Sequence, residues 1–360
     1  MVAVLANVEA QTALKDAFKN DFLVGTALQE PEFEGTDTNA VTIIKAQFNA
    51  ISAENALKWE FVHTNRGEFN FKEADEYVAF GLTNHMFVVG SILIWHHQTP
   101  PWVFQDDQGN PISRNALLER MHEHIQTVVG RYKGKIGGWV VVAEALNEDG
   151  SLHRSQWERI IGPDYLVKAY QFAHEADPDA QLYYDDYSLE NYSKRAAAVA
   201  LIKNLQSNRI PIAAVGLEGH YKLDWPPTNQ VDHTIKAFAS LGVKVMISEL
   251  DIDMQPRVMI SQLAEVATNT TLQAQLTLFT NGFTASAQEQ LAKRYADLFK
   301  VFVANRDSIS RVTIWGVTDG QSWLNDWPIK GRISYPLLFD RNYQPKPAFD
   351  AIIQVAHAQK

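Results

Sequence analysis

The sequence predicts an α/β fold, a single (β/α)8 barrel whose active site lies at the C-terminal ends of the strands. Two observations indicate this fold. Eight apolar, strand-like runs alternate with segments of helical periodicity, and no Gly/Ser-rich or Pro-rich linker divides the chain. A doubly wound sheet is the alternative, but its glycine-rich phosphate loop after the first strand is missing. We therefore expect one domain over residues 1–360.

The individual elements are predicted from local patterns. Helical spacing is clearest for Leu118, Met121, Ile125, Val129 and Tyr132, and again for Leu291, Tyr295, Leu298 and Phe302. Residues 254–285, after the seventh strand, are expected to form a long loop that walls the binding site. The expected strands are Phe22–Ala27, Phe48–Ser52, Phe87–Trp95, Gly138–Glu144, Gln181–Asp186, Ala213–His220, Val243–Leu250 and Arg311–Val317.

Composition excludes several classes of function. The formal net charge of −10, without a long basic run, argues against nucleic-acid and membrane partners. The absence of cysteine excludes disulfides, thiolate metal sites and cysteine nucleophiles. Met1 to Asn20 lack a basic leader and a cleavage signal, so we expect no signal peptide in this chain, and the source compartment stays open. We expect a monomer.

Two of the expected strands end in a glutamate. Glu144 follows the β-branched run Val140–Val142, and Glu249 stands at the corresponding point after Val243–Ser248. Because the C-terminal ends of parallel strands meet at one rim of a barrel, we expect the two carboxylates to face each other. Other side chains expected at this rim are Glu54, Asn55, Lys58, Trp95, His96, Gln98, Asp185, Asp186, Tyr187, Glu218, His220, Asp251, Trp315, Asp319 and Trp323.

These residue types favour glycoside hydrolysis. Two carboxylates flanked by tryptophans can act as a protonated acid and an ionised nucleophile. Neither a nucleophile elbow with a catalytic triad nor a phosphate-binding loop is recognisable. His96, His97 and His220 could supply metal ligands, but no two have the helical spacing of an HExxH zinc site. We therefore expect no metal and no cofactor.

Several longer motifs carry a family resemblance. They are Glu54–Trp59, Trp95–Pro100, Glu144–Gly150, Ser248–Asp251, Trp315–Asp319, Tyr335–Asp340 and Lys346–Phe349. With them, the chain from about residue 20 to residue 356 resembles glycoside hydrolase family 10, the retaining endo-β-1,4-xylanases. The resemblance implies a barrel enzyme that acts on xylan or xylo-oligosaccharides.

The resemblance also implies roles for single residues. Glu144 matches the general acid/base and Glu249 the nucleophile, with His220 beside it. Trp315 and Trp323 match aromatic residues around the scissile sugar, and Tyr187 matches a stacking platform beyond the cleavage point. The residues that match the sugar-binding groups of the non-reducing side are Glu54, Asn55, Lys58, Trp95, His96 and Gln98.

Five pocket positions depart from the family pattern. Ser91 replaces a histidine, Val140 an aspartate, Ala143 and Asp185 asparagines, and Glu218 a glutamine. The lost asparagine at position 143 would bond the sugar 2-hydroxyl, and such a bond is worth roughly 1.5–3 kcal/mol. We therefore expect xylan hydrolysis at a reduced rate.

Two alternatives stay open. The pocket could have been engineered for another reaction, such as a Kemp elimination in which Glu144, Glu218 or Glu249 abstracts a proton from a small aromatic substrate in an apolar slot. The chain could also be a carbohydrate-binding barrel without turnover. The retention of both Glu144 and Glu249 argues against a pure binder.

Overall fold

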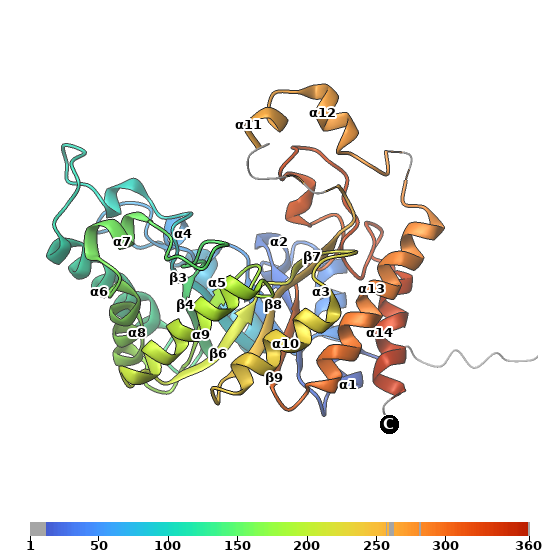
Figure 1. Cartoon of the computed structure of the whole chain (residues 1–360), viewed down its shortest axis with the longest axis horizontal. Helices are drawn as coiled ribbons and strands as arrows, with labels where there is room; N and C mark the ends of the chain where they lie inside the picture. The colour runs from blue at the N-terminus through green and yellow to red at the C-terminus, as the bar shows by residue number, and fades with distance from the viewer. Residues whose placement is uncertain (1–11, 257, 259–262, 281, 359–360) are drawn as a thin grey trace, which may run out of the picture.

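Eight parallel strands close into a barrel in the computed structural model, which describes residues 12–256, 258, 263–280 and 282–358 (Figure 1). Each strand pairs with its neighbour in chain order, and β9 pairs with β1 to complete the ring. The predicted (β/α)8 fold is therefore confirmed. The strands are β1 Leu23–Leu28, β2 Ala50–Ala53, β3 Phe87–Ile94, β4 Gly138–Ala143, β5 Gln181–Asp186, β6 Ile212–Leu217, β8 Lys244–Asp253 and β9 Ile309–Ile314.

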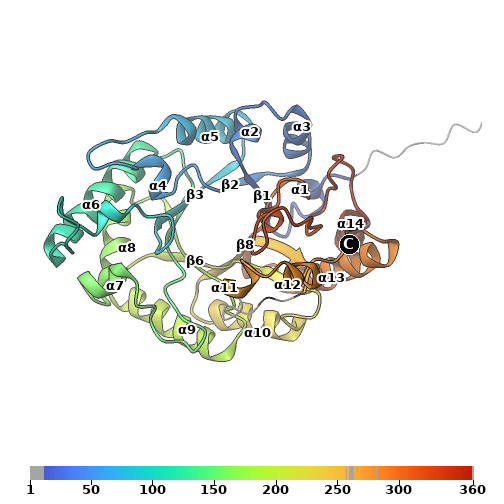
Figure 2. The same cartoon turned by 90° about the horizontal axis from the view of Figure 1, so that it is seen from above.

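Helices surround the barrel, as the view from above shows (Figure 2). The predicted periodicities fall on α6 and α13, and each helix turns an apolar face towards the barrel. The helices are α1 Leu14–Ala17, α2 Glu30–Phe33, α3 Thr38–Gln47, α4 Trp59–Val62, α5 Lys72–Thr83, α6 Arg114–Arg131, α7 Gln156–Ile161, α8 Tyr165–Ala176, α9 Tyr192–Ser207, α10 Thr228–Ala239, α11 Leu263–Val266, α12 Thr270–Gln275, α13 Ala285–Ala304 and α14 Pro347–His357, with short 3-10 turns at Pro101–Val103 and Trp323–Asn325.

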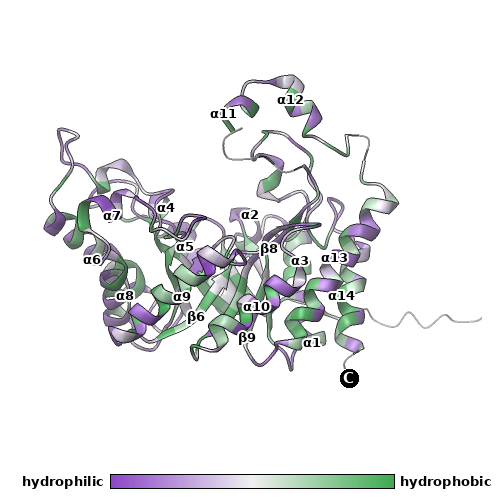
Figure 3. Ribbon diagram, viewed as in Figure 1, coloured by the Kyte–Doolittle hydropathy of each residue, from purple (hydrophilic) through white to green (hydrophobic). Residues whose placement is uncertain are grey.

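The interior of the barrel is packed with side chains. Apolar residues gather on the strands and on the inner faces of the helices, whereas polar residues lie outside (Figure 3). At one level of the barrel the Arg311 guanidinium lies 5.3 Å from the ring centre of Phe87 and 5.4 Å from that of Tyr183. A second, separate apolar cluster comprises Val89, Ile92, Val140, Ala143, Tyr183, Ala214 and Met246. The barrel is therefore a filled core, open to ligands only at its rim.

The sixth expected strand is interrupted. β6 ends at Leu217, and a short strand β7, His220–Lys222, then pairs with the outer part of β8, with His220 opposite Asp251. Gly219 between them has φ of 83°, a left-handed conformation that glycine adopts without steric cost. The expectation of one continuous strand over 213–220 is therefore wrong, and the break brings His220 alongside β8.

The predicted long loop of residues 254–285 is partly helical. It contains α11 and α12, which lie above the rim of the barrel in Figure 1, although parts of this segment lie outside the described residues. On the opposite side of the barrel, α1 packs against α14, so both ends of the described chain lie far from the rim. Within the described ranges, no helix combines the length and the apolar character needed to cross a membrane.

Candidate active site

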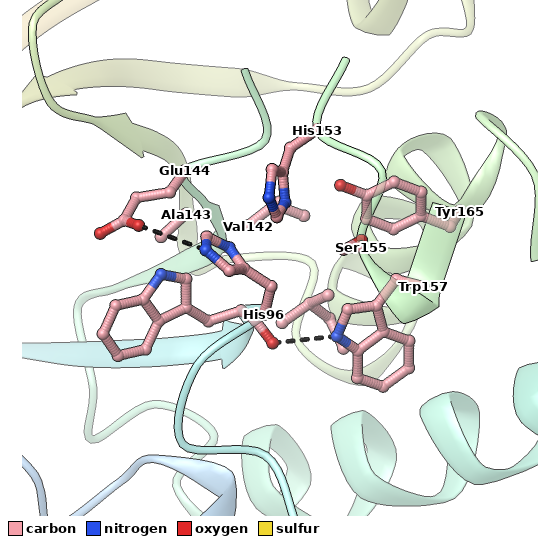
Figure 4. A pocket seen from close by; sticks show the side chains of 10 residues that line it. His96, Val142, Ala143, Glu144, His153, Ser155, Trp157 and Tyr165 are labelled. Carbon is pink, nitrogen blue, oxygen red and sulfur yellow. Dashed lines mark hydrogen bonds and ion pairs between the residues drawn. The ribbon is translucent and has the colours of Figure 1, made fainter. Parts of the chain in front are cut away.

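Glu144 follows directly after β4. It adopts a left-handed backbone conformation with φ of 52°, and its N–H donates to the Asp185 carbonyl oxygen at 2.9 Å. Its Oε2 lies 3.8 Å from Nε2 of His96 (Figure 4). Burial, together with the nearby carboxylates of Asp186 and Glu249, raises the pKa of Glu144 to about 7. Glu144 can therefore hold a proton at neutral pH.

Glu249 lies within β8, in contact with a cation. Its Oε2 is 3.1 Å from Nε2 of His220, and Nδ1 of the same ring is 3.1 Å from Oδ1 of Asp251. Burial alone would lower the pKa of His220, but Asp251 and Glu249 raise it to about 10. The indole of Trp323 donates to the other oxygen of Asp251 at 2.8 Å. Glu249 is thus paired with an imidazolium that a second carboxylate orients.

A polar network follows β2 and β3. Nζ of Lys58 donates to Oε1 of Gln98 at 2.7 Å and to Oδ1 of Asn55 at 3.1 Å. The amide of Gln98 donates to the same oxygen of Asn55 at 3.2 Å. Lys58 also lies 5.0 Å from the ring centre of Trp95. Four residues predicted for the sugar site are therefore joined in one network.

Glu54 belongs to a neighbouring cleft. Its Oε2 accepts a hydrogen bond of 2.9 Å from the amide of Gln29, and burial raises its pKa. Gln29, Glu54, Trp323 and Trp327 line this cleft, and the two indoles stack with ring centres 5.3 Å apart. Gln29 and Trp327 are absent from the sequence predictions. The spacing of Trp327, four residues after Trp323, is the signal that could have indicated it.

The other predicted aromatic residues lie at two places. The rings of Trp315 and Trp323 flank His220, with ring centres 6.4 Å and 4.9 Å away. Tyr187 follows β5, and its ring centre lies 3.3 Å from Nζ of Lys194. Lys194 in turn forms a fully buried ion pair with Asp186, 2.8 Å long. The position of Tyr187 is therefore tied to the first turn of α9.

Two of the departures from the family pattern are buried carboxyl groups. Burial raises the pKa of Asp185 and of Glu218 well above the usual range, and Glu249 and Glu144 add to this increase. Oδ1 of Asp185 accepts a hydrogen bond of 2.6 Å from Ser248. Gly216 makes room for this carboxyl, because a Cβ there would overlap the same oxygen. Burial and the neighbouring acids therefore favour the protonated form of both groups.

The three other departures lie inside the barrel. Ser91, Val140 and Ala143 are 3%, 2% and 4% exposed, and the latter two belong to the apolar cluster with Ile92 and Met246. The neighbouring side chains close around these small residues. The apolar surface that they contribute is therefore mostly packed core, and only the Ala143 end borders the pocket beside Glu144 (Figure 4).

Two further histidines stand beside His96. The ring centres of His97 and His153 lie 4.1 Å and 4.2 Å from that of His96. Burial, together with the two neighbouring imidazoles, lowers the pKa of His96 to about 3. His153 comes from the segment between β4, which ends at Ala143, and α7, so no sequence spacing indicated this cluster.

Comparisons with known proteins point to one family of enzymes. Residues 13–355 match the model of glycosyl hydrolase family 10. The chain is 41% identical to endo-1,4-beta-xylanase A of Xylanibacter ruminicola, over 99% of this chain and 96% of the relative. It is 38% identical to an endo-1,4-beta-xylanase of Geobacillus stearothermophilus, over 95% and 98% of the two chains.

Solved structures agree as well. A family 10 endoxylanase from a sugarcane soil metagenome superposes with a TM-score of 0.89 at 40% identity, over 96% of this chain and 100% of the other. A xylanase of Paenibacillus barcinonensis, solved with a conduramine derivative, superposes with a TM-score of 0.87 at 36% identity, over 96% and 99%.

Proposed function

Because the chain belongs to glycosyl hydrolase family 10 and is therefore a glycoside hydrolase, we propose that it cleaves internal β-1,4 bonds of xylan with retention of configuration. The observation that carries the proposal is the contrast between two carboxyl groups of the rim, one directly after β4 and one on β8. Glu144 has a pKa raised to about 7, whereas Glu249 is paired with the imidazolium of His220. Retaining hydrolysis needs one protonated acid and one charged nucleophile.

In this mechanism Glu144 gives its proton to the glycosidic oxygen as the bond breaks. Glu249 attacks the anomeric carbon and forms a covalent glycosyl-enzyme. Glu144, now deprotonated, takes a proton from the water that releases the sugar. His220 and Asp251 hold the Glu249 carboxylate in place through the two imidazole nitrogens.

We assign sugar binding to the two groups of residues around these carboxyl groups. The linked amide and ammonium groups of Asn55, Lys58 and Gln98 offer several donors to sugar hydroxyls. Trp315 and Trp323 offer flat faces near Glu249 on which a sugar ring can pack. Trp95, His96 and Tyr187 would border the remaining parts of the cleft.

We further propose that the subsite next to Glu144 is weakened but not destroyed. Ala143 offers no side-chain donor to a sugar hydroxyl, a loss of about one to two powers of ten in rate. Asp185 and Glu218 act differently, because a protonated carboxyl has one donor and one acceptor, like the amide that family members carry there. The two acids therefore preserve the hydrogen-bonding pattern as long as they stay protonated.

A Kemp elimination, the engineered alternative, is supported by one observation. Glu218 is a buried carboxyl with a raised pKa, and desolvated carboxylates are stronger bases. Glu144 and Glu249, which help to raise the pKa of Glu218, are also the two carboxyl groups that a glycoside hydrolase needs. We therefore place the Kemp elimination second.

Parallel assays decide between the two reactions. Turnover of an aryl β-xylobioside and of 5-nitrobenzisoxazole is measured for the native protein, Glu249→Gln and Glu218→Gln. We expect xylobioside cleavage that Glu249→Gln abolishes. Benzisoxazole opening that only Glu218→Gln abolishes, without sugar cleavage, would establish the alternative. If native protein is silent in both assays but binds xylohexaose, the chain is a carbohydrate binder.

A further inference from the structure

A cluster of imidazoles meets a carboxylate at one side of the rim, and the reaction proposed above does not use all of it. One ligand atom from each of His96, His97 and Glu144 lies within 4.8 Å of the others. Glu144 Oε2 lies 3.8 Å from His96 Nε2. In a tetrahedral zinc site with bonds of about 2.0–2.1 Å, neighbouring ligand atoms lie roughly 3.4 Å apart.

His153 adds a third imidazole. Its ring lies beside that of His96 in Figure 4, with ring centres 4.2 Å apart. Nδ1 of His153 is buried and has no hydrogen-bond partner among the residues that the structure describes. A buried polar atom without a partner is costly, so a ligand that it could bind would relieve that cost.

From the sequence we expected no metal, because these histidines lack the spacing of a helical zinc motif. That expectation considered one route only. His96 and His97 lie on the loop after β3, and the fold brings Glu144 from the end of β4 and His153 from the next loop to the same place. Ligands from separate segments need no fixed sequence spacing.

We propose that His96, His97 and Glu144 form a binding site for a divalent transition-metal ion of the Zn²⁺ class, with His153, whose ring lies beside that of His96, as a candidate fourth ligand. Imidazole and carboxylate together suit Zn²⁺, Ni²⁺ and Cu²⁺ better than Mg²⁺ or Ca²⁺, which prefer all-oxygen sites. The site is open enough for an ion to enter, because His97 is exposed and His96 and Glu144 are partly exposed.

Occupation of this site would switch the enzyme off reversibly. A metal ion bound to Glu144 occupies the oxygen that would deliver the proton to the glycosidic bond. This consequence rests on the proposed function of Glu144, whereas metal binding itself does not.

The other histidine–carboxylate cluster of the rim is a weaker candidate. Glu218, His220 and Glu249 also place one ligand atom each within 4.8 Å of one another. Both imidazole nitrogens of His220 are already engaged, with Glu249 and with Asp251, each at 3.1 Å. A metal there would have to displace one of these contacts.

Calorimetric titration with ZnCl2 tests the proposal without substrate. We expect the native protein to bind one Zn²⁺ saturably, and His97→Asn to weaken binding roughly ten- to a hundredfold. Glu218→Gln should bind like the native protein. His122→Asn is the matched control, because His122 also lies 3.8 Å from a carboxylate, that of Glu175, but without a second imidazole.

Two further readouts complete the test. Co²⁺ should give the intense visible absorption of a tetrahedral complex with the native protein and not with His97→Asn. Zn²⁺ should inhibit xylobioside cleavage by the native protein, with recovery on adding EDTA, while His97→Asn keeps its metal-free turnover and resists inhibition. Thermal melting without metal checks that the exposed substitution leaves the fold intact.

The proposal is overturned if the native protein binds no Zn²⁺ saturably, if His97→Asn and His122→Asn bind it equally well, or if Glu218→Gln rather than His97→Asn loses it. Saturable binding without inhibition would leave the metal site standing and would instead count against Glu144 as the proton donor.

Discussion

Glu144, directly after β4, and Glu249, within β8, are the same residue type in contrasting surroundings. Glu144 lies beside the uncharged imidazole of His96. Burial and the nearby acids raise the pKa of Glu144 to about 7. Glu249 lies against an imidazolium that Asp251 holds from the other side. The surroundings of Glu144 favour its protonated form, whereas those of Glu249 place a cation beside it. The comparison teaches that the proposed division of labour between the two glutamates depends on their neighbours and not on their positions on the strands.

Removal of Glu249 should have the largest effect. Glu249→Ala is expected to lower turnover of an aryl β-xylobioside by at least about 10⁴-fold, because no covalent intermediate can form. Added azide should restore some activity from the vacated face and give the α-glycosyl azide, identified by NMR. Residual native-like turnover with β-configured products would contradict the assignment.

Removal of Glu144 should have a smaller effect that depends on the leaving group. Glu144→Ala is expected to lower xylan hydrolysis roughly 10²- to 10⁴-fold, the usual contribution of a general acid. The loss should be much smaller for a dinitrophenyl xylobioside, which needs no proton to depart. Azide should here give the β-glycosyl azide. Equal losses on both substrates would break the comparison between the two glutamates.

Restoration of an amide should sharpen the comparison. Ala143→Asn is expected to raise kcat/KM on xylobiosides by about ten- to a hundredfold, since the new donor reaches a sugar hydroxyl. Ala143→Leu serves as a control for added bulk without a donor and should not raise the rate. If both variants are slower than the native protein, the packed cluster around Ala143 admits no larger side chain, and the subsite has been closed.

The smallest predicted effect concerns the dependence of kcat on pH. A general acid must be protonated, so kcat should stay level below pH 7 and fall by about tenfold per unit as pH rises past the Glu144 pKa of about 7. Glu144→Gln should remove this alkaline limb from its residual activity on an activated substrate. An alkaline limb that survives Glu144→Gln would assign it to another group, for which Asp185→Asn and Glu218→Gln are the next variants.

Much of the fold could be predicted from sequence because its signals are local. Gly138–Ala143 is an apolar, bounded run, and both it and Gln181–Asp186 are strands within one residue of their predicted limits. The left-handed turns at Glu144 and Gly219 could not be predicted in the same way, because they depend on contacts with neighbouring strands. These two turns determine the positions of the side chains of Glu144 and His220.

The sequence could predict which residues belong to the candidate site, but not the contacts between them. His220 contacts Glu249 at 3.1 Å, but its pairing with Asp251 depends on the register between β7 and β8. The contact of Glu54 with Gln29 joins residues 25 positions apart. The cluster of His96, His97 and His153 arises from two loops. Such contacts follow from tertiary packing and leave no periodic trace in the chain.

The packing of α1 against α14, on the side of the barrel away from the rim, has a practical consequence. A support attached beyond α14 would hold the protein by its base, with the catalytic cleft facing the solution. Long, stiff polymers could then approach without touching the support. Insoluble fibres could not approach a flat carrier closely, so the same attachment would be a disadvantage there. On a soluble scaffold each barrel mouth would point outward, and the attachment would be an advantage.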